Sequence, residues 1–466
     1  MASFAIPPAI FAGSKRVRHT QLRLRMIRGE WADDYAEYRL KRIGTVRASA
    51  WGPPETLDCP MRDLPRAVSV LHIEPMDVRH LADDAAAEEV HERLGYMGAQ
   101  EVLGEAQFLT EALNECAVKL EVLDDGRMSL RQVTPDLLGG ISADGRPGVP
   151  AVLWEWILRE VDGRLQYVRD FWDVRDPLAP VRDIRAADDQ VIERLEWPEV
   201  HVRADGRAVL PYSLRHSIGA PLGLWSPEYR RETVGGTFRL AVHSDMIDHS
   251  ITNAAFKQKY GVNVVPMGAS TRDAGGEPVQ SVPGDPASIL LFGTDPDAPP
   301  GAQAILDQFD ESAPISEMQD VLERRRSQLA SMWGVNASDL VRASPNPTSG
   351  VALSLSRAGI REVQRNRSPI YRPHDERLCA MLAVAMNRTD GGTRPESGYS
   401  VRYQLLPLSQ GEQDQRTRET LEMHRLGLFS KAEARARITG EDIEQAEDRI
   451  SRIASTASQT PEEGTP

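Results

Sequence analysis

The sequence predicts an elongated, multidomain α+β fold. Three Asp-Gly steps lie between short β-type runs in residues 116–215, whereas a helical spacing of apolar residues covers 228–260 and returns after residue 316. Strand and helix signals therefore occupy separate stretches of the chain, which is typical of α+β proteins. The chain of 466 residues has room for about three domain-sized units.

The N-terminal part is predicted to be mainly helical. Residues 1–50 are basic and helical in pattern, and residues 83–123 alternate acidic helical patches with apolar positions. The start of the chain lacks the basic residues and long apolar core of a signal peptide. No stretch approaches the ~20 apolar residues of a membrane span, so we expect neither export nor a membrane partner.

Residues 116–215 are predicted to be rich in β-hairpins. The three steps Asp125-Gly126, Asp162-Gly163 and Asp205-Gly206 each supply the positive φ angle that a tight hairpin turn needs. Aromatic residues recur here at strand spacing, and we expect them to pack the buried face rather than to form a ligand-binding box. These residues are Trp154, Trp156, Tyr167, Phe171 and Trp172.

A long helix is predicted at 228–260 from apolar residues spaced four or five apart. At ~1.5 Å per residue, a continuous helix of this length spans roughly 50 Å. The Gly235-Gly236 pair is expected to kink it or to start it. Residues 261–300 are rich in Gly, Pro and Asp, which predicts an extended excursion that leaves and rejoins a helical body.

Two further helices flank a segment of helix breakers. The first is expected to have Ser316 as its cap, with Gln319 completing a capping box, and to end at Gly334. Residues 342–350 read RASPNPTSG, and their two prolines and final glycine oppose a helix. The helical pattern then resumes over 351–388.

The C-terminal part is predicted to hold a short strand at 399–406 and then small helices. Gly427 is expected to stop the first of these helices, and residues 456–466 are expected to be disordered because they are rich in Ser, Thr, Pro and Glu. Two capping boxes mark helix starts; they pair Ser409 with Glu412 and Ser430 with Glu433.

Composition and motifs disfavour several functional classes. The net charge of −14 argues against a simple basic nucleic-acid binder, although it leaves room for DNA contact on one surface. Cys59, Cys116 and Cys379 lie far apart and form no CxxC, which disfavours a disulfide framework or a cysteine zinc site. GxSxG, HExxH, GxGxxG and a Walker loop are absent. We therefore expect no enzymatic activity, no catalytic residues, no cofactor and no metal.

One stretch of this acidic chain is strongly basic. Between residues 323 and 377 the cations are all arginines and outnumber the acids. Such a segment needs a partner. Two interpretations remain open: salt bridges to acidic parts of neighbouring subunits, and contact with a phosphate backbone.

The second half of the chain resembles the portal proteins of tailed bacteriophages, which are also called head-to-tail connectors. The residues that carry the resemblance are ERRRSQLASMWGVNASDL (323–340), PTSGVALSLSRAGIREVQR (347–365), RPHDERLCAMLAVAMN (372–387), ESGYSVRYQLLPLSQGEQ (396–413) and LGLFSKAEARARITGEDIEQAEDRI (426–450). In the first half, LRQVTPDLL (130–138) and the hairpins after it resemble a portal wing. The resemblance covers about three quarters of the chain and contains no short diagnostic motif.

The resemblance implies a portal-like subunit of a cyclic ring, built from a wing, a stem, a clip and a crown. The implied divisions are an N-terminal wing at 1–225, a stem helix at 226–260, a clip at 261–290, a wing continuation at 291–408 that contains the long wing helix and the tunnel loop at about 335–352, and crown helices with a disordered tail at 409–466. Only residues 303–310 offer a candidate for a second stem helix.

The implied function is passage of double-stranded DNA through a ring, expected to be a dodecamer, at the capsid vertex during packaging and ejection. The implied partners are the terminase large subunit, a head–tail adaptor, and the major capsid and scaffolding proteins, and assembly would take place in the host cytoplasm. Two alternatives remain: a nucleic-acid-processing enzyme such as a Mg²⁺-dependent nuclease, and another virion structural protein.

The segment of helix breakers is the predicted tunnel loop. A polar loop between two long helices belongs on a surface, because its backbone groups need water, and in a portal-like ring that surface is the channel; an outer-surface connector is the alternative. The candidates for facing DNA are Arg342, Ser344, Asn346, Thr348, Ser349, Arg357 and Arg361.

Overall fold

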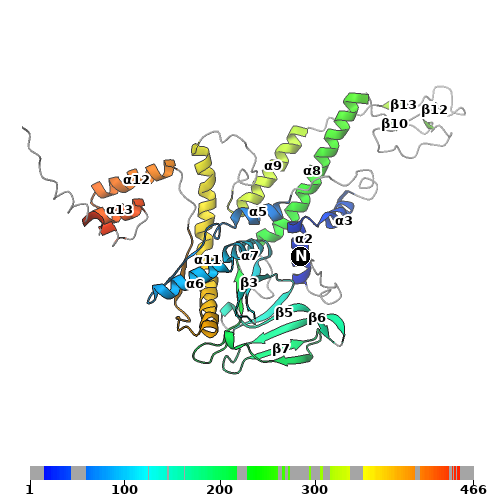
Figure 1. The fold of residues 1–466 in the computed structure, drawn as a ribbon. Helices are drawn as coiled ribbons and strands as arrows, with labels where there is room; N and C mark the ends of the chain where they lie inside the picture. Colours follow the sequence, from blue (N-terminus) through cyan, green and yellow to red (C-terminus); the bar gives the residue numbers. More distant parts are fainter. Residues whose placement is uncertain are drawn as a thin grey trace, which may run out of the picture. The chain divides into compact units, whose positions relative to one another are not determined.

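The computed structural model describes most of the chain (Figure 1). The chain divides into two compact units. Unit 1 comprises Met1–Leu340 and Val363–Gln404, and unit 2 comprises Val341–Glu362 and Leu405–Pro466. The described residues are 15–43, 59–123, 125–143, 146–161, 163–217, 228–260, 265–267, 271–272, 293–294, 305–307, 315–335, 350–404, 410–439, 443, 446–447 and 449–451.

The described elements mix helices with antiparallel strands, which confirms the α+β class. The helices are α2 (Lys15–Arg28), α3 (Ala32–Ile43), α5 (Pro60–Val68), α6 (Asp84–Tyr96), α7 (Ala99–Leu113), α8 (Glu228–Tyr260), α9 (Ile315–Met332), α11 (Gly350–Asp390), α12 (Gln410–Arg425) and α13 (Lys431–Thr439). The larger sheets are built from β2 (Glu115–Val122), β3 (Met128–Val133), β4 (Leu138–Ala143), β5 (Arg146–Val161), β6 (Arg164–Asp173), β7 (Val181–Arg185), β8 (Val191–Leu195) and β9 (Tyr212–His216). The remaining strands form three small pairs, namely β1 (Asp77–His80) with β14 (Tyr399–Arg402), β10 (Val265–Met267) with β13 (Ile305–Asp307), and β11 (Thr271–Arg272) with β12 (Gly293–Thr294).

Unit 1 contains a three-stranded sheet in the order β3–β2–β9 and a five-stranded sheet in the order β4–β5–β6–β7–β8. Helix α7 packs on the three-stranded sheet, where Leu103 and Phe108 join Val118 and Leu120 in the main apolar core. A second apolar cluster joins the two sheets, and it includes Leu153 of β5. Two sheets and the helices thus share buried side chains within one unit.

The glycines of all three Asp-Gly steps adopt the positive φ angle that was predicted for them. Gly126, Gly163 and Gly206 adopt φ angles of +79°, +73° and +81°. A fourth turn of the same kind joins β7 to β8 and was missed, because its left-handed residue is Asp189, with φ of +73°, rather than glycine. Asp tolerates this conformation better than most side chains, since its carboxylate can accept local backbone hydrogen bonds.

The aromatic residues of the hairpin region do not share one buried face. Trp172 pairs with Leu153 and packs in the cluster between the two sheets. Trp154 and Phe171 pair with each other and point to the opposite face of the five-stranded sheet. There the guanidinium of Arg185 lies 3.5 Å from the Phe171 ring centroid. The prediction of a common buried face is therefore wrong, because successive strand residues alternate between faces.

Helix α8 has the predicted bounds, and helix α9 runs antiparallel beside it (Figure 1). Leu322 near the start of α9 packs in one cluster with Ile247, whereas Trp333 just after its end donates a hydrogen bond of 2.9 Å to Thr233 Oγ1. The candidate second stem helix at 303–310 is wrong for residues 305–307, which form strand β13.

The start of α9 also differs from its prediction. The helix begins at Ile315, so Ser316 lies inside it and cannot be the cap. Its predicted end is correct: Gly334 adopts a φ of +75°, and the amide of Val335 donates to the carbonyl of Ala330. This is the left-handed glycine termination expected at a helix C-terminus.

Helix α11 covers the predicted helical stretch and continues through Pro369 and Pro373. Its part in unit 1 is strongly apolar over 378–386 and lies in the main core. The following strand, β14, ends at Arg402, before the predicted 406, and pairs with β1. Residues near 80 and near 400 are thus joined in one antiparallel ladder.

Unit 2 contains α12 and α13 among its described residues. The predicted capping box of α13 is confirmed: the Ser430 amide donates to Glu433 at 2.7 Å, and the Glu433 amide donates to Ser430 at 3.1 Å. Gly427 follows α12 with a φ of +73°, as predicted. The other predicted cap, Ser409, and the tail at 456–466 lie outside the described residues.

Candidate functional site

Most residues of the predicted tunnel loop lie outside the part of the chain that the structure describes. Its flanks are described: Val335 follows α9, and Gly350 begins α11. The candidates outside the described residues are Arg342, Ser344, Asn346, Thr348 and Ser349. Arg357 lies within α11, and Arg361 of the same helix is buried at 8% exposure.

Some arginines of the basic segment at 323–377 form contacts within the chain. In unit 1, Arg325 of α9 lies 3.1 Å from the His243 ring nitrogens, and Arg367 of α11 pairs with Glu111 at 3.3 Å. Arg324 and Arg365 are exposed. Intrachain contacts therefore take up some of the arginines, and the exposed ones leave both predicted kinds of partner, neighbouring subunits and phosphate backbone, open.

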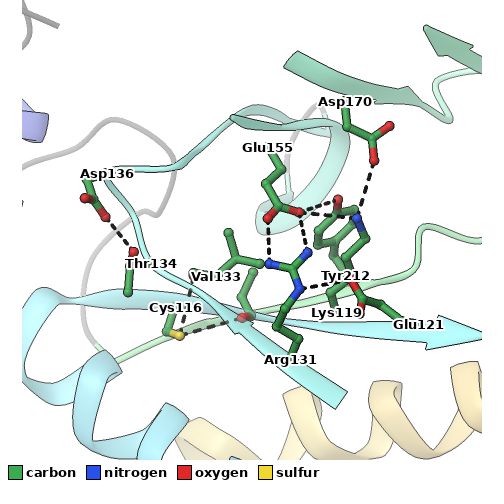
Figure 2. A network of polar contacts seen from close by, with 11 residues as sticks. Cys116, Lys119, Glu121, Arg131, Val133, Thr134, Asp136, Glu155, Asp170 and Tyr212 are labelled. Carbon is green, nitrogen blue, oxygen red and sulfur yellow. Dashed lines mark hydrogen bonds and ion pairs between the residues drawn. The ribbon is translucent and has the colours of Figure 1, made fainter. Parts of the chain in front are cut away.

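A network of polar contacts lies between the two sheets of unit 1 (Figure 2). Glu155 of β5, 2% exposed, accepts two hydrogen bonds from Arg131 of β3, at 2.7 and 3.0 Å, and one from Tyr212 at 3.2 Å. Lys119 of β2 bridges Glu155 at 3.3 Å and Asp170 of β6 at 3.4 Å. Figure 2 shows the carboxylates of one sheet pointing toward the cations of the other.

The electrostatics of this network fix its charges. Burial by itself raises the pKa of Glu155, but the hydrogen bonds from Arg131 and the charge of Lys119 outweigh it and hold the pKa below its usual range. Burial and the neighbouring Glu155 raise the pKa of Tyr212 well above its usual value. Both pKa values move away from pH 7, so neither group is suited to proton transfer near that pH. The network instead links the two sheets through paired charges.

A second buried polar centre lies where α11 crosses β9. Asp375 is fully buried; it pairs with Arg215 and accepts hydrogen bonds from His72 at 3.0 Å and Tyr403 at 2.5 Å. Burial raises the pKa of this carboxyl, but Arg215 and His72 more than offset it and hold the pKa well below its usual range. One carboxylate thereby joins a helix, a strand and two loops.

The described residues offer no activated thiol. Burial raises the pKa of Cys59 to about 11 and that of Cys116 to about 12, and it raises the pKa of Cys379 further. A thiolate nucleophile requires the opposite shift. Within the described ranges, no three His, Cys, Asp or Glu side chains are grouped so that they could hold a metal ion, and no helix is long and apolar enough to cross a membrane.

Sequence reasoning found neither of the two buried centres. A partial signal for the first was present: Glu155 interrupts the apolar run VLWEWIL at a position that alternation places on the same face as Leu153. An acid on an inward-facing position requires a buried cation. Asp375 gave no such signal, because it lies in a polar stretch, RPHDER, of a helix.

Two comparisons with known proteins find no relative of this chain. A scan against protein-family models finds no match, and a search of curated proteins finds no significantly similar sequence.

Proposed function

We propose that this chain is the subunit of a phage portal ring, through which double-stranded DNA is packaged and ejected. The order of elements supports the proposal. A hairpin-rich region of helices and antiparallel strands precedes the long helix α8. Small strand pairs follow it, and α9, α11 and short C-terminal helices come next. This order corresponds to the wing, stem, clip, wing continuation and crown that the sequence resemblance implies.

The observation that carries the proposal is the antiparallel pairing of α8 with α9 on either side of residues 261–314. A portal stem needs an outgoing and a returning helix around its clip, and the candidate that the sequence offered for the second, residues 303–310, contains strand β13 instead. The two helices approach closely at Gly236, where a Cβ atom would lie 2.8 Å from Leu329. In the proposed ring, α9 therefore belongs to the stem rather than to the wing continuation that the resemblance implies for it, and the segment after it leads to the tunnel loop.

Exposed apolar side chains on the two helices support assembly. Ile251 is 44% exposed, Val321 39% and Met332 42%. Large apolar residues at these levels on paired helices are suited to cover one another in adjacent subunits. A repeated head-to-tail contact of this kind closes into a ring when its rotation permits.

The charge of the chain fits a channel through which DNA slides. With a net charge of −14, the subunit as a whole repels phosphate, so DNA would be guided without tight binding. In this proposal the ring occupies the capsid vertex. Its partners are terminase, a head–tail adaptor, and the capsid and scaffolding proteins, and it assembles in the host cytoplasm.

The test of the proposal is the particle that the purified protein forms. Negative-stain images should show rings with a central hole, and light scattering should give a mass many times 51.6 kDa. A protein that stays monomeric over a wide concentration range would refute the portal proposal. Metal-dependent cleavage of DNA by that monomer would favour the nuclease alternative, and closed assemblies without a hole would favour another virion component.

The tunnel-loop assignment has its own test. Bulky replacements at Asn346, Thr348 and Ser349 should leave rings intact but impair DNA packaging or retention. Equally bulky replacements at Glu88 and Glu92, exposed on α6, should leave both unchanged. Normal packaging with the loop variants would refute the channel assignment, and failed assembly would place the loop at a subunit contact.

Removing one positive charge tests whether the same loop contacts DNA. Replacing Arg342 with alanine removes one cation that is expected to face the channel. The salt dependence of DNA association should then change by about one charge unit or less. An unchanged salt dependence would place Arg342 away from DNA.

A further inference from the structure

Four basic side chains gather where the end of β9 meets α11 in unit 1. Arg215 and His216 are the last residues of β9, and His374 and Arg377 lie three residues apart on α11, so the latter two share one helical face. The imidazole rings of His216 and His374 are in edge contact, with centroids 4.8 Å apart. The charge of Arg377 acts on both imidazoles, and that of Arg215 acts on His374.

These side chains have more buried polar nitrogens than the described residues satisfy. Arg215 Nε and Nη1, His216 Nδ1, His374 Nδ1 and Arg377 Nη1 are all buried and have no hydrogen-bond partner in the described part of the chain. Arg215 uses only Nη2, which donates to Asp375. Five such nitrogens on four neighbouring side chains are unusual, because buried polar atoms are normally paired.

The ion pairs at this cluster do not include Arg377. Asp375 pairs with Arg215, and Glu115 pairs with Arg16 from α2. Within the described residues, no ion pair is formed by Arg377. Burial lowers the pKa of Arg377, and no carboxylate offsets that effect. A half-buried cation of this kind calls for an anion.

We propose that Arg215, His216, His374 and Arg377 form a binding site for a phosphate group. Guanidinium groups bind phosphate through pairs of parallel hydrogen bonds, and imidazole nitrogens add further donors. A phosphate presents three acceptor oxygens to donors that arrive from a strand and a helix. His216 and Arg377 are only partly buried, so parts of these two side chains reach solvent.

The phosphate can come from two sources, a free anion or the backbone of a nucleic acid. The site consists of residues of unit 1 alone, so the proposal does not depend on ring formation. Filling it would satisfy nitrogens that otherwise remain unpaired, and it would neutralise Arg377. Binding is therefore expected to stabilise the folded protein.

The test titrates the full chain with inorganic phosphate, and separately with a short DNA duplex, against chloride of equal ionic strength. Calorimetry and thermal unfolding should show saturable binding and a rise in Tm. Arg377→Gln should weaken phosphate binding roughly 10- to 100-fold, whereas Arg365→Gln, which removes an exposed arginine of the same helix, should not. His374→Gln is a second variant that keeps the charge of the folded protein.

The outcomes separate the two sources. Stabilisation by phosphate alone identifies a free anion as the ligand. Duplex binding that needs Arg377 and that phosphate competes away identifies a phosphodiester. The proposal is overturned if neither ligand stabilises the protein beyond matched chloride, or if Arg377→Gln and Arg365→Gln behave alike; ordered water then fills the site. The stability of Arg377→Gln without phosphate, expected to equal or exceed that of the unmodified chain, shows that the variant folds.

Discussion

Two adjacent glycines of α8 provide a matched test of the α8–α9 packing. A Cβ atom at Gly236 would lie 2.8 Å from both Cδ atoms of Leu329, whereas at Gly235 its nearest contact is Arg239 Nη1 at 3.5 Å. Leu329 is 7% exposed and packs beside Trp333, so it cannot turn away freely. Only one of the two glycines is therefore needed for the close approach of the helices.

The expected effects have opposite signs. Alanine in a helix interior is favoured over glycine by about 1 kcal/mol, so Gly235→Ala should stabilise the protein by up to that amount. At Gly236 the same gain is opposed by overpacking, which costs about 1–3 kcal/mol. The two variants should therefore differ by about 1–3 kcal/mol in the free energy of unfolding, with Gly236→Ala the less stable.

Urea unfolding at one fixed protein concentration measures this difference, because assembly would otherwise shift the midpoint. A double variant, Gly236→Ala with Leu329→Ala, should be more stable than the sum of the single effects by about 1–3 kcal/mol, since the smaller side chain makes room for the new methyl group. Equal stability of the two glycine variants, or strictly additive effects in the double variant, would refute the packing geometry.

Three further predictions concern the buried charges and the tail. Glu155→Gln leaves the cations of its network without their shared carboxylate and should cost about 3–5 kcal/mol in urea unfolding, whereas Glu160→Gln, exposed on the same strand, should cost less than about 0.5 kcal/mol. Burial lowers the pKa of His374 to about 3 and that of His201 to about 4. Below about pH 6.5 the unfolded chain therefore binds more protons than the folded protein, and the free energy of unfolding should fall by about 2 kcal/mol per histidine between pH 6.5 and pH 5. Glutamine at either position should reduce this decline. Deleting residues 456–466 should leave the oligomeric mass in light scattering unchanged, because a polar tail buries little surface; loss of assembly would show that the tail belongs to a subunit contact.

The local features of the fold were predictable because single residues determine them. Gly126 and Gly206 mark turns through backbone freedom, and Ser430 with Glu433 marks a helix start through two reciprocal hydrogen bonds. The long helix α8 follows from a repeat of apolar residues. Asp189 escaped the same reasoning because the sequence does not reveal which aspartate adopts a left-handed backbone.

The pairing of elements was not predictable in the same way. The apolar stripe of α9 indicated a helix with one buried face but not its partner, so its role as the companion of α8 was missed. The close contact depends on Gly236 and Leu329, 93 residues apart in the chain. No local pattern links such positions, and the Gly235-Gly236 pair was expected to kink or start a helix rather than to admit a neighbour.

The two buried polar centres differ in one respect that composition cannot reveal. Around Glu155, Arg131 and Lys119 find carboxylates from the opposite sheet, so the network is closed by the chain itself. Around Asp375 the single carboxylate is shared by Arg215 and His72, and no ion pair of Arg377 is found among the described residues. Both centres contain buried cations, but the closed one holds the fold together. An anion would satisfy the unpaired buried nitrogens and neutralise Arg377. A ligand is therefore expected at the junction of β9 and α11 rather than in the larger network.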